Sequence, residues 1–525
     1  MSAQAIYVTV IVIFLLIALI RDRMRPGLVL LSGAILFYVT GILTPKEMLE
    51  GFSNKGMITV ALLFLVSEGV RRSGLLEKVL IGLLPKKNAS IRRVQWRMLP
   101  VVSFISAFLN NTPVVVIFAP MVKRWAEKMH QPASKLLIPL SYATILGGVC
   151  TLIGTSTNLV IHGMALDEAA RHPNGGVRGL SMFELSQIGL IVAVVGLFYI
   201  IAIGSKILPE HRESAEETPV EEDKRIEVVL APRFPAIGKK VADFDFEQKY
   251  GAQLLEIHRG GQIFHVHDMR QQMFHEGDTL VLAADDNFMA NWGDSSFFLV
   301  VNDMRHLNEP MMGPKMRWFT IILLILMVLG ATIGELPPVV KFANDLIPGL
   351  KFDMFFFVCV VTLIMAWLGM FPARKYTKFV SWDILIAIAS AFAISKAMQN
   401  SGMADAIAQW AVSLAEGRRP QFLLGVVFII GAVFTELMTN NAAAALCFPI
   451  AISLAQHMGV SPMPFIVTLC IAASSSFCTP IGYQTNLIVQ GIGGYKFSDY
   501  FKIGLPLSFI VGTITVLVVP LIWSF

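Results

Sequence analysis

The sequence predicts an all-α polytopic membrane protein built from two repeats of inverted topology, with a small α/β domain inserted between them. Three observations carry this prediction: an apolar composition, motifs that recur at a nearly constant offset, and one long polar interval. The 525 residues are 55% hydrophobic and 15% charged, whereas soluble domains average about 25% charged residues. Apolar segments such as Ile6–Ile20, Pro26–Leu43 and Leu505–Trp523 approach the roughly 20 residues that cross a bilayer core.

The polar interval, residues 206–316, separates a first membrane repeat, 1–205, from a second, 317–525. It opens with an acidic, proline-containing linker, Glu210–Asp223. A folded module over about 224–303 is expected after the linker, because short β-branched runs alternate there with turn residues. Its predicted strands are Ile226–Leu230, Ala252–Ile257, Gln262–Val266 and Thr279–Ala284.

Histidines and cysteines give little indication of a metal site. His265 and His267 are expected on one face of a strand, near His258 and His275. Surface histidines are nevertheless favoured, because no cysteine or third carboxylate clusters with them. All five cysteines lie in apolar segments, without the spacing of disulfides or metal clusters. The net charge of +5 reflects basic loops and needs no nucleic acid.

Three motifs recur in the two halves, which indicates an internal duplication. The pairs are Phe108–Val122 with Leu437–Ala451, Phe64–Gly74 with Phe392–Gly402, and Thr151–Leu159 with Thr479–Leu487. The first pair has an offset of 329, since Asn440 minus Asn111 is 329, and the other two have an offset of 328.

The basic loops orient the two repeats oppositely, because loops rich in Lys and Arg stay inside. Met57–Arg71 ends at a basic pair and runs inward, whereas its counterpart Trp382–Lys396 follows Arg374, Lys375 and Lys378 and runs outward. Inverted repeats of this kind are typical of secondary transporters. A purely structural duplication is the alternative.

Charges beside the apolar segments also predict on which side of the membrane each segment ends. Three arginines between residues 21 and 25 follow the first segment, which is therefore expected to be a retained helix with an outer N-terminus rather than a signal peptide. Lys206, Lys315 and Arg317 flank the inserted domain and place it in the cytoplasm. The chain is expected to be a multi-pass protein of a cell membrane, such as a bacterial inner membrane.

Polar, uncharged stretches interrupt the apolar segments at 110–113, 151–159, 439–442 and 479–487. Irregular backbone at membrane depth persists only where protein buries it or where it lines a cavity, so hairpin tips and helix breaks are predicted there. Thr112-Pro113 and Thr479-Pro480 each place an N-cap residue before a proline at the first helical position, and Asn441 is a further candidate cap. Free N–H groups at such helix starts can bind an anion without a cationic side chain.

Two cation sites are predicted beside this anion site. Ser106 and Thr435 occupy the same repeat position, one turn before each hairpin tip, and oxygens freed at helix breaks can coordinate Na⁺. The alternative is that these polar residues only join neighbouring helices. Glu68, Lys396 and Glu436 lie near segment ends, where an interfacial position is favoured. Of these three, Glu436 is the candidate coupling residue.

At these residues the chain resembles the divalent anion:sodium symporter family. The family's two Ser-Asn-Thr tip motifs resemble Asn110-Asn111-Thr112 and Thr439-Asn440-Asn441, which depart from them at the first or third position. The resemblance implies a homodimer, an elevator-type motion and Na⁺ as coupling ion, with no other cofactor and no catalytic residues. The implied substrate-binding residues are Asn110, Asn111, Thr112, Ser156, Thr439, Asn440, Asn441, Thr479, Pro480 and Gln484. The implied Na⁺ ligands are Ser106, Asn110, Asn111 and Gly148 in one half, and Thr435, Met438, Asn440 and Cys478 in the other, several of them through backbone oxygens.

The T-P-I-G-Y-Q-T-N-L motif and the inserted domain most resemble the sulfate-transporting branch of the family. The segment Glu227–Val301 resembles a TrkA-C (RCK-C) module, which would either bind a small regulatory ligand or only dimerise. Sulfate is the leading substrate, and dicarboxylates, arsenite or another metalloid, and proton coupling are the alternatives. A ligand-gated channel would need a filter such as T-V-G-Y-G, and a membrane sensor would need no duplicated breaks. An ATP-driven pump is disfavoured because the chain contains no G-x-x-x-x-G-K-[ST].

Overall fold

A computed structural model describes residues 2–525 with gaps. The residues left out are 22–23, 86–88, 211–224, 260–261, 285–287, 289–291, 293–294, 296, 304–311, 373–375 and 415–418. The predictions for Arg374, Lys375 and most of the linker Glu210–Asp223 therefore fall outside the described residues.

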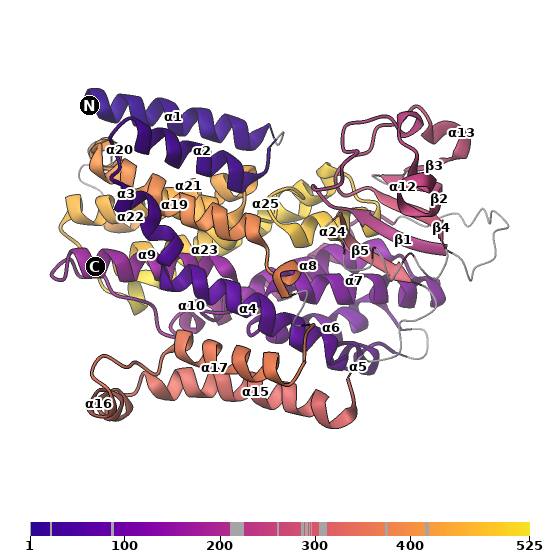
Figure 1. The fold of residues 1–525 in the computed structure, drawn as a ribbon, viewed down its shortest axis with the longest axis horizontal. Helices are drawn as coiled ribbons and strands as arrows, with labels where there is room; N and C mark the ends of the chain where they lie inside the picture. Colours follow the sequence, from indigo (N-terminus) through magenta and orange to yellow (C-terminus); the bar gives the residue numbers. More distant parts are fainter. Residues whose placement is uncertain are drawn as a thin grey trace.

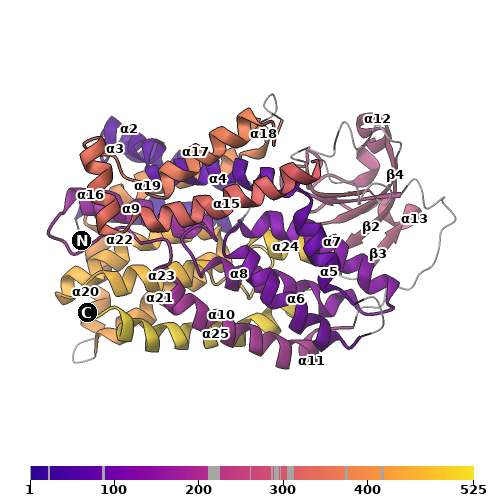
Figure 2. The same ribbon diagram turned by 90° about the horizontal axis from the view of Figure 1, so that it is seen from below.

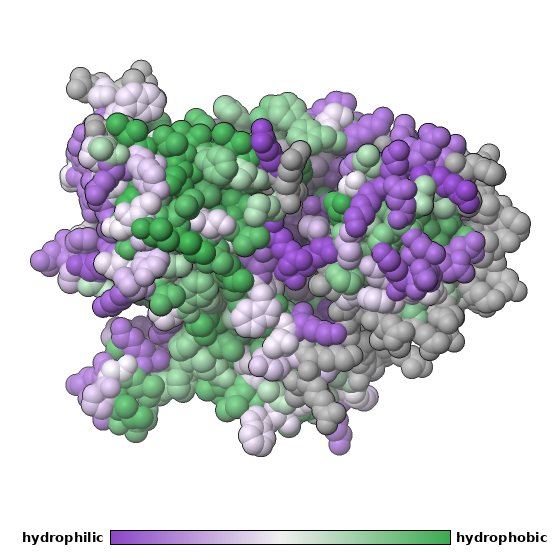
Figure 3. Space-filling model, turned by 45° about the horizontal axis from the view of Figure 1, so that its top comes forward, coloured by the Kyte–Doolittle hydropathy of each residue, from purple (hydrophilic) through white to green (hydrophobic). Residues whose placement is uncertain are grey.

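Eight helices among the described residues are long and apolar enough to cross a membrane. Most run roughly parallel to one another, and a small sheet lies beyond one end of them (Figures 1 and 2). Hydrophobic residues cover much of the helical part and hydrophilic residues cover the sheet domain (Figure 3). The eight spans are Ala3–Ile20, Pro45–Arg72, Ser186–Ile207, Pro314–Gly334, Trp382–Asn400, Pro420–Leu437, Asn440–Met458 and Phe497–Ile522. The chain is a multi-pass membrane protein.

Each half of the membrane part contains two pairs of helices, and a polar stretch separates the two helices of each pair. In the first half these pairs are α6 (Ile91–Ser106) with α7 (Asn111–Lys128), and α8 (Leu137–Gly148) with α9 (Ser156–Arg171). In the second half they are α21 (Pro420–Leu437) with α22 (Asn440–Met458), and α23 (Met463–Ser474) with α24 (Gln484–Gly493). All four interruptions fall within or beside the predicted stretches.

Helices that precede these pairs make contacts that cross between the halves. Helix α2 (Pro26–Val39) packs against α19 (Trp382–Asn400), and α4 (Lys55–Arg72) packs against α17 (Met354–Trp367). An offset of 328 carries Pro26 onto residue 354 and Lys55 onto residue 383, so the two contacts are counterparts of each other. The other helices are α1 (Ala3–Ile20), α3 (Pro45–Glu50), α5 (Leu75–Leu83), α10 (Ser186–Tyr199), α11 (Ser205–Ile207), α15 (Pro314–Gly334), α16 (Pro337–Leu346), α18 (Tyr376–Phe379), α20 (Met403–Leu414) and α25 (Phe497–Ile522).

The inserted domain is a five-stranded antiparallel sheet in the order β3-β2-β4-β1-β5. All four predicted strands are present, and a fifth follows them. The strands are β1 (Arg225–Leu230), β2 (Ala252–Arg259), β3 (Gln262–His265), β4 (Thr279–Ala284) and β5 (Phe298–Asp303), accompanied by the short helices α12 (Phe246–Tyr250) and α13 (Val266–Met269). The prediction that His265 and His267 share a strand face is wrong, because β3 ends at His265 and the chain turns into α13.

The two faces of the sheet pack against different partners, as the alternation of side chains along a strand requires. Ile226, Val228 and Leu230 of β1 contact an aromatic cluster within the domain, which includes Phe234 and Phe274. Val229, between them, instead belongs to the hydrophobic core of the membrane part. The sheet is therefore docked on the helices through one face.

This docking reaches α24 and α7, which both begin at predicted polar stretches. The turn at Gly277, where φ is +79°, lies against Leu487, and α24 approaches the turn so closely at Gly491 that a Cβ there would lie 2.4 Å from the Gly277 carbonyl oxygen. On α7, the buried Lys123 ammonium lies 3.6 Å from the Glu227 carboxylate, and its charge holds the pKa of Glu227 below the usual range.

We predict that Gly491→Ala loosens the sheet domain from α24, because the added methyl group has no room and overpacking costs about 1–3 kcal/mol. Faster amide hydrogen exchange in α24 and β1 is the expected result. The control is Gly425→Ala in α21, where an added Cβ would meet nothing closer than Val516 at 4.0 Å. Equal exchange in both variants would contradict this account of the docking.

Candidate functional site

Two asparagine amides hold the irregular backbone between the interrupted helices. Between α8 and α9, the Asn158 amide donates to the carbonyl oxygens of Thr151 (2.8 Å) and Gly148 (3.4 Å). Between α23 and α24, the Asn486 amide donates to the carbonyl oxygens of Thr479 (3.1 Å) and Ser476 (2.9 Å). Both asparagines are fully buried. Asn486 thus holds backbone groups that the second break frees, and Asn158 does the same in the other half.

Threonine hydroxyls tie each break to the neighbouring hairpin. Thr151 Oγ1 donates to the Ala107 carbonyl and accepts from Gly154 N at 3.2 Å. Thr479 Oγ1 donates to the Glu436 carbonyl at 3.2 Å and accepts from Gly482 N at 3.3 Å. Since Glu436 minus Ala107 is 329, the same network of bonds occurs in both halves.

The hairpin tips also have matching internal bonds. Ser106 Oγ lies 2.5 Å from the Asn111 side-chain amide, and Thr435 Oγ1 lies 2.7 Å from the Asn440 side-chain amide. Thr435 Oγ1 also lies 2.6 Å from the Ala473 carbonyl oxygen, and its single proton can be donated to only one of these two groups. The structure thus brings together the Ser106–Asn111 and Thr435–Asn440 pairs on which the cation prediction rests.

Each tip contacts the interrupted helix of the other half. Thr112 Oγ1 lies 3.4 Å from Gln484 Oε1, and Asn441 Oδ1 accepts from Ser156 Oγ at 3.2 Å. Residue 112 corresponds to 441 and residue 156 to 484 under the two offsets, so these two contacts are counterparts. Four of the predicted substrate-binding residues are therefore paired across the halves.

Thr155 and Tyr483 meet between the two pairs. They are the N-cap residues of α9 and α24, with similar backbone angles of φ −138°, ψ 145° and φ −136°, ψ 132°. Their hydroxyl oxygens lie 3.2 Å apart, and Tyr483 also lies 2.6 Å from the Asn111 amide. The N-cap side chains of α9 and α24 therefore meet. Sequence reasoning missed Tyr483, although the alignment of T-S-T-N with Y-Q-T-N marks it as the larger member of the pair.

Three predicted helix starts are wrong. Helix α7 begins at Asn111 with Asn110 as N-cap, and α22 begins at Asn440 with Thr439 as N-cap, so neither Thr112 nor Asn441 is a cap. Helix α24 begins at Gln484, after the predicted Thr479-Pro480 start. Gly482 N donates to the Thr479 hydroxyl as it would to an N-cap residue, and the Asn486 amide binds the Thr479 carbonyl oxygen, so Thr479 closes a turn that precedes the helix.

The second predicted cation site is arranged differently from the sequence-based ligand set. The counterpart of Gly148 is Ser476, since 148 plus 328 is 476. Ser476 Oγ is buried without a hydrogen-bond partner, and a Cβ on Gly482 would lie 2.2 Å from it and 2.4 Å from the Thr435 carbonyl oxygen. Met438 is the C-cap of α21, whereas Cys478 Sγ lies 3.6 Å from Ser508 Oγ.

Glu436 and Glu68 both have polar partners within the protein. Glu436 Oε1 accepts from the backbone N–H groups of Phe477 and Cys478, at 2.7 Å each. Glu436 therefore braces the second break, and its interfacial position stays a prediction. Glu68 is buried and pairs with the two adjacent arginines, Arg71 and Arg72. Among the described residues, no group of three His, Cys, Asp or Glu side chains could hold a metal ion.

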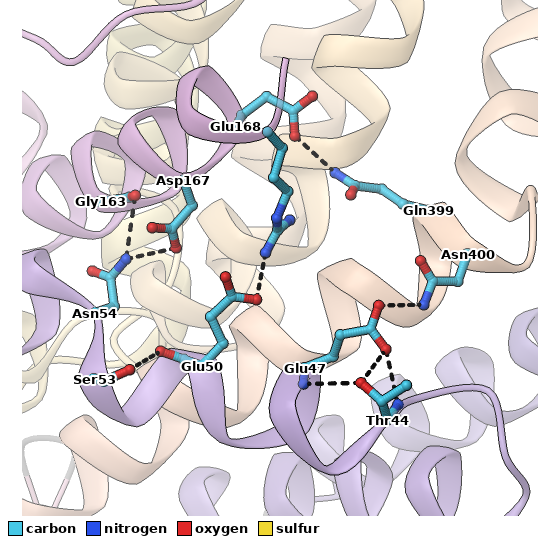
Figure 4. Close-up of polar contacts among 11 residues, drawn as sticks. Thr44, Glu47, Glu50, Ser53, Asn54, Gly163, Asp167, Glu168, Gln399 and Asn400 are labelled. Carbon is cyan, nitrogen blue, oxygen red and sulfur yellow. Dashed lines mark hydrogen bonds and ion pairs between the residues drawn. The ribbon is translucent and has the colours of Figure 1, made fainter. Parts of the chain in front are cut away.

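A second polar cluster fixes the C-terminal half of α9 (Figure 4). The Asn54 amide donates to Asp167 Oδ2 at 2.8 Å and to the Gly163 carbonyl at 3.3 Å. Arg171 pairs with Glu50 at 2.7 Å. Helix α9 is thus joined to α3 and α4 at the end away from Ser156.

We predict that Asn486→Ala lowers the thermal unfolding midpoint of the purified protein. The change leaves two buried carbonyl groups without their donor, which costs about 1–3 kcal/mol. The control, Asn344→Ala, removes an exposed amide on α16. Equal midpoints for the two variants would show that the amide of Asn486 does not support the break.

Comparisons with known proteins agree with this architecture. The sequence model of the citrate transporter family matches residues 14–347 and 346–525. An uncharacterized transporter of Synechocystis sp. is 28% identical over 98% of this chain and 96% of its own length. Sodium/sulfate cotransporter 1 of Chlamydomonas reinhardtii is 32% identical over 51% of this chain and 29% of its own length. The fold resembles that of the Alcanivorax borkumensis YdaH transporter, with a TM-score of 0.52, 13% identity, and coverage of 93% of this chain and 88% of that one.

The family match extends over almost the whole chain, including both halves of the membrane part and the sheet domain. The Synechocystis relative, which aligns over almost its whole length, is also described as a transporter, and the YdaH transporter shares the fold. The chain therefore belongs to the citrate transporter family and is a multi-pass membrane transporter.

Proposed function

We propose that the protein is a secondary active symporter that couples Na⁺ to the movement of a divalent oxyanion, with sulfate as the leading substrate. The observation that carries the proposal is the contact between Thr155 and Tyr483. It brings the N-termini of α9 and α24 together, and helix N-termini favour anions through free N–H groups and the helix dipole. Sodium/sulfate cotransporters among the relatives support the same substrate class.

The anion would bind beside the cross-half pairs Thr112–Gln484 and Ser156–Asn441. These four side chains are neutral, so they can donate hydrogen bonds to an oxyanion without holding it as tightly as a buried cation would. The predicted ligands Asn110, Asn111, Thr439 and Asn440 lie at the starts of α7 and α22, next to these pairs. Thr479 and Pro480 would act indirectly, by shaping the loop before α24.

Na⁺ would bind at each hairpin tip. Ser106, Asn111 and Gly148 supply oxygens in the first half, and Thr435, Asn440 and Ser476 supply them in the second. We propose that Ser476 is a further ligand beside the backbone oxygens of this segment, because Ser476 Oγ is buried without a hydrogen-bond partner among the described residues. Two cations would offset the charge of one dianion at membrane depth.

The matched contacts of the two halves support an inverted-repeat transporter. Helices α6 to α9 and α21 to α24 would move together as a transport domain against the remaining helices, within a homodimer, in an elevator-type cycle. The cluster of Asn54, Asp167, Glu50 and Arg171 would then hold α9 against α3 and α4 in this conformation. We place the sheet domain, a TrkA-C-like module, on the cytoplasmic side, where it could regulate transport or dimerise.

A citrate-like polycarboxylate is the second candidate substrate. The family match supports it, and the two cross-half pairs could each bind one carboxylate. Sulfate is preferred because several relatives are sodium/sulfate cotransporters.

Uptake of radiolabelled sulfate into proteoliposomes tests the proposal. We expect accumulation that requires an inward Na⁺ gradient and resists excess succinate or citrate. Asn111→Ala and Asn440→Ala should each abolish coupled uptake, because each removes an amide at a hairpin tip, while Asn344→Ala should not. Equal uptake with a proton gradient would show that H⁺ rather than Na⁺ is the coupling ion. Inhibition by succinate or citrate would show that a carboxylate rather than sulfate is the substrate.

Absence of sulfate uptake under any gradient would contradict the proposed substrate. The matched test is uptake of labelled citrate and succinate by the same vesicles. Normal coupled uptake by both asparagine variants, at wild-type protein levels, would instead contradict the assignment of Asn111 and Asn440 to the binding site.

A further inference from the structure

Helix α16 has an apolar side that the described part of the chain leaves uncovered. The helix belongs to a segment that leaves the end of α15 and returns to it at the start of α17, because a Cβ on Gly334 would lie 1.6 Å from the Phe352 carbonyl oxygen. Of the ten residues of α16, only Ala343 is buried. The large apolar side chains of the helix and its caps are 38–61% exposed: Leu336, Val340, Phe342, Leu346 and Ile347.

The apolar and polar residues of α16 lie on opposite sides of the helix. Apolar residues recur with the spacing i, i+3, i+4 and i+7, which is the pattern of one helix face: Val339, Phe342, Ala343 and Leu346. Exposed polar residues follow the spacing i, i+3 and i+4 on the other side: Lys341, Asn344 and Asp345. An amphipathic helix of this kind is stable only if something apolar covers one side of it.

The orientation of α16 is that of a helix in the plane of a membrane. Figures 1 and 2 show it lying across the end of α15, on the side of the molecule away from the sheet domain. Helix α15 has 21 residues, or about 30 Å of helix, which equals the thickness of a bilayer core. The exposed Trp318 near the start of α15 suits one membrane interface, and α16 follows the other end of the span.

An exposed ion pair lies at the same end of the helices. Asp353 is the N-cap of α17, where it accepts from Phe356 N at 3.2 Å, and it pairs with Lys55 at the start of α4. These two side chains are 30% and 39% exposed. Charged side chains are costly in hydrocarbon, so the starts of α4 and α17 mark the membrane surface. Because α16 connects α15 to α17, it lies at that surface too.

The exposed apolar side of α15 continues directly onto α16. Exposed residues of α15 recur along one side of the helix: Ile322, Ile325, Leu326, Leu329 and Ile333. Leu336, at the start of α16, follows Ile333 at the spacing i+3. Helix α15 is one of the candidate membrane spans, so its exposed apolar side faces hydrocarbon, and the continuity favours the same surroundings for α16. The charges of Lys341 and Asp345 cancel, so attraction to anionic headgroups is not needed.

We propose that α16 is an interfacial membrane anchor, with its apolar side among the upper acyl chains of the lipid and its polar side toward water. Phospholipid, rather than a second copy of the chain, is the partner that covers it. The anchor would hold α15 and α17 at a fixed depth, and with them α4, which packs against α17. This role does not depend on which anion or coupling ion the protein carries.

Photo-cross-linking of the full chain in proteoliposomes identifies what covers α16. Leu346 on the apolar side and, as the matched control, Lys341 on the polar side are each replaced by the photoreactive residue p-benzoylphenylalanine, in vesicles of phosphatidylcholine. After irradiation, mass spectrometry should show a phospholipid adduct at position 346 in several-fold higher yield than at position 341. Adding phosphatidylglycerol should leave that yield unchanged, because the polar side carries no net charge.

Amide hydrogen exchange in the same vesicles tests whether the lipid contact holds the helix in place. Leu346→Gln should speed exchange in α16, because glutamine has a helix propensity close to that of leucine but lacks its apolar contact with lipid. Lys341→Gln introduces the same residue on the polar side and should leave the exchange unchanged. Neither measurement involves transport, so failure of the proposed substrate or coupling ion would leave both results standing.

A cross-linked dimer at position 346 in place of a lipid adduct would overturn the proposal, because a second copy of the chain would then cover the helix. Equal adduct yields at positions 346 and 341, or no lipid adduct at position 346, would overturn it as well. A yield that rises with phosphatidylglycerol would contradict an anchor based on apolar contact. Equal exchange in the two glutamine variants would show that lipid does not hold α16.

Discussion

Backbone N–H and C=O groups inside a membrane must find partners within the protein, and at the two helix breaks the amides of Asn158 and Asn486 supply the donors. Each amide binds two carbonyl groups of the irregular segment that precedes it. Because these carbonyls are satisfied, the chain can leave the helix at depth and restart it as α9 or α24. The polar contacts between the two halves depend on these two irregular segments being held in place.

From these two anchors the remaining contacts follow in matching pairs. The restarted helices meet at Thr155 and Tyr483, and their first turns contact the hairpin tips of the opposite half. The two halves differ at the centre, where one contributes a threonine and the other a tyrosine. This difference breaks the symmetry of the site. The same helix, α24, is contacted at its far end by the sheet domain, through Gly277 and Gly491.

The sequence alone predicted the membrane class, the position of all four interruptions and four of the five strands. Composition, the constant offset between the repeats and the alternation of residues can all be read from the sequence without knowledge of the packing. The start of α24 was not predictable, because Thr479 makes a cap-type bond to Gly482 N although the helix begins only at Gln484. Tyr483 and Ser476 were missed for a similar reason: their importance depends on contacts with the other half or with Gly482.

The central claim is that one anion binds where the N-termini of α9 and α24 converge. A structure determined with selenate in Na⁺ tests it most directly, because selenium scatters anomalously and marks the anion. The account predicts a single anomalous peak within hydrogen-bond distance of Ser156 or Gln484, next to the hydroxyl of Tyr483. A peak confined to the sheet domain, or none at selenate concentrations that compete with sulfate binding, would contradict it.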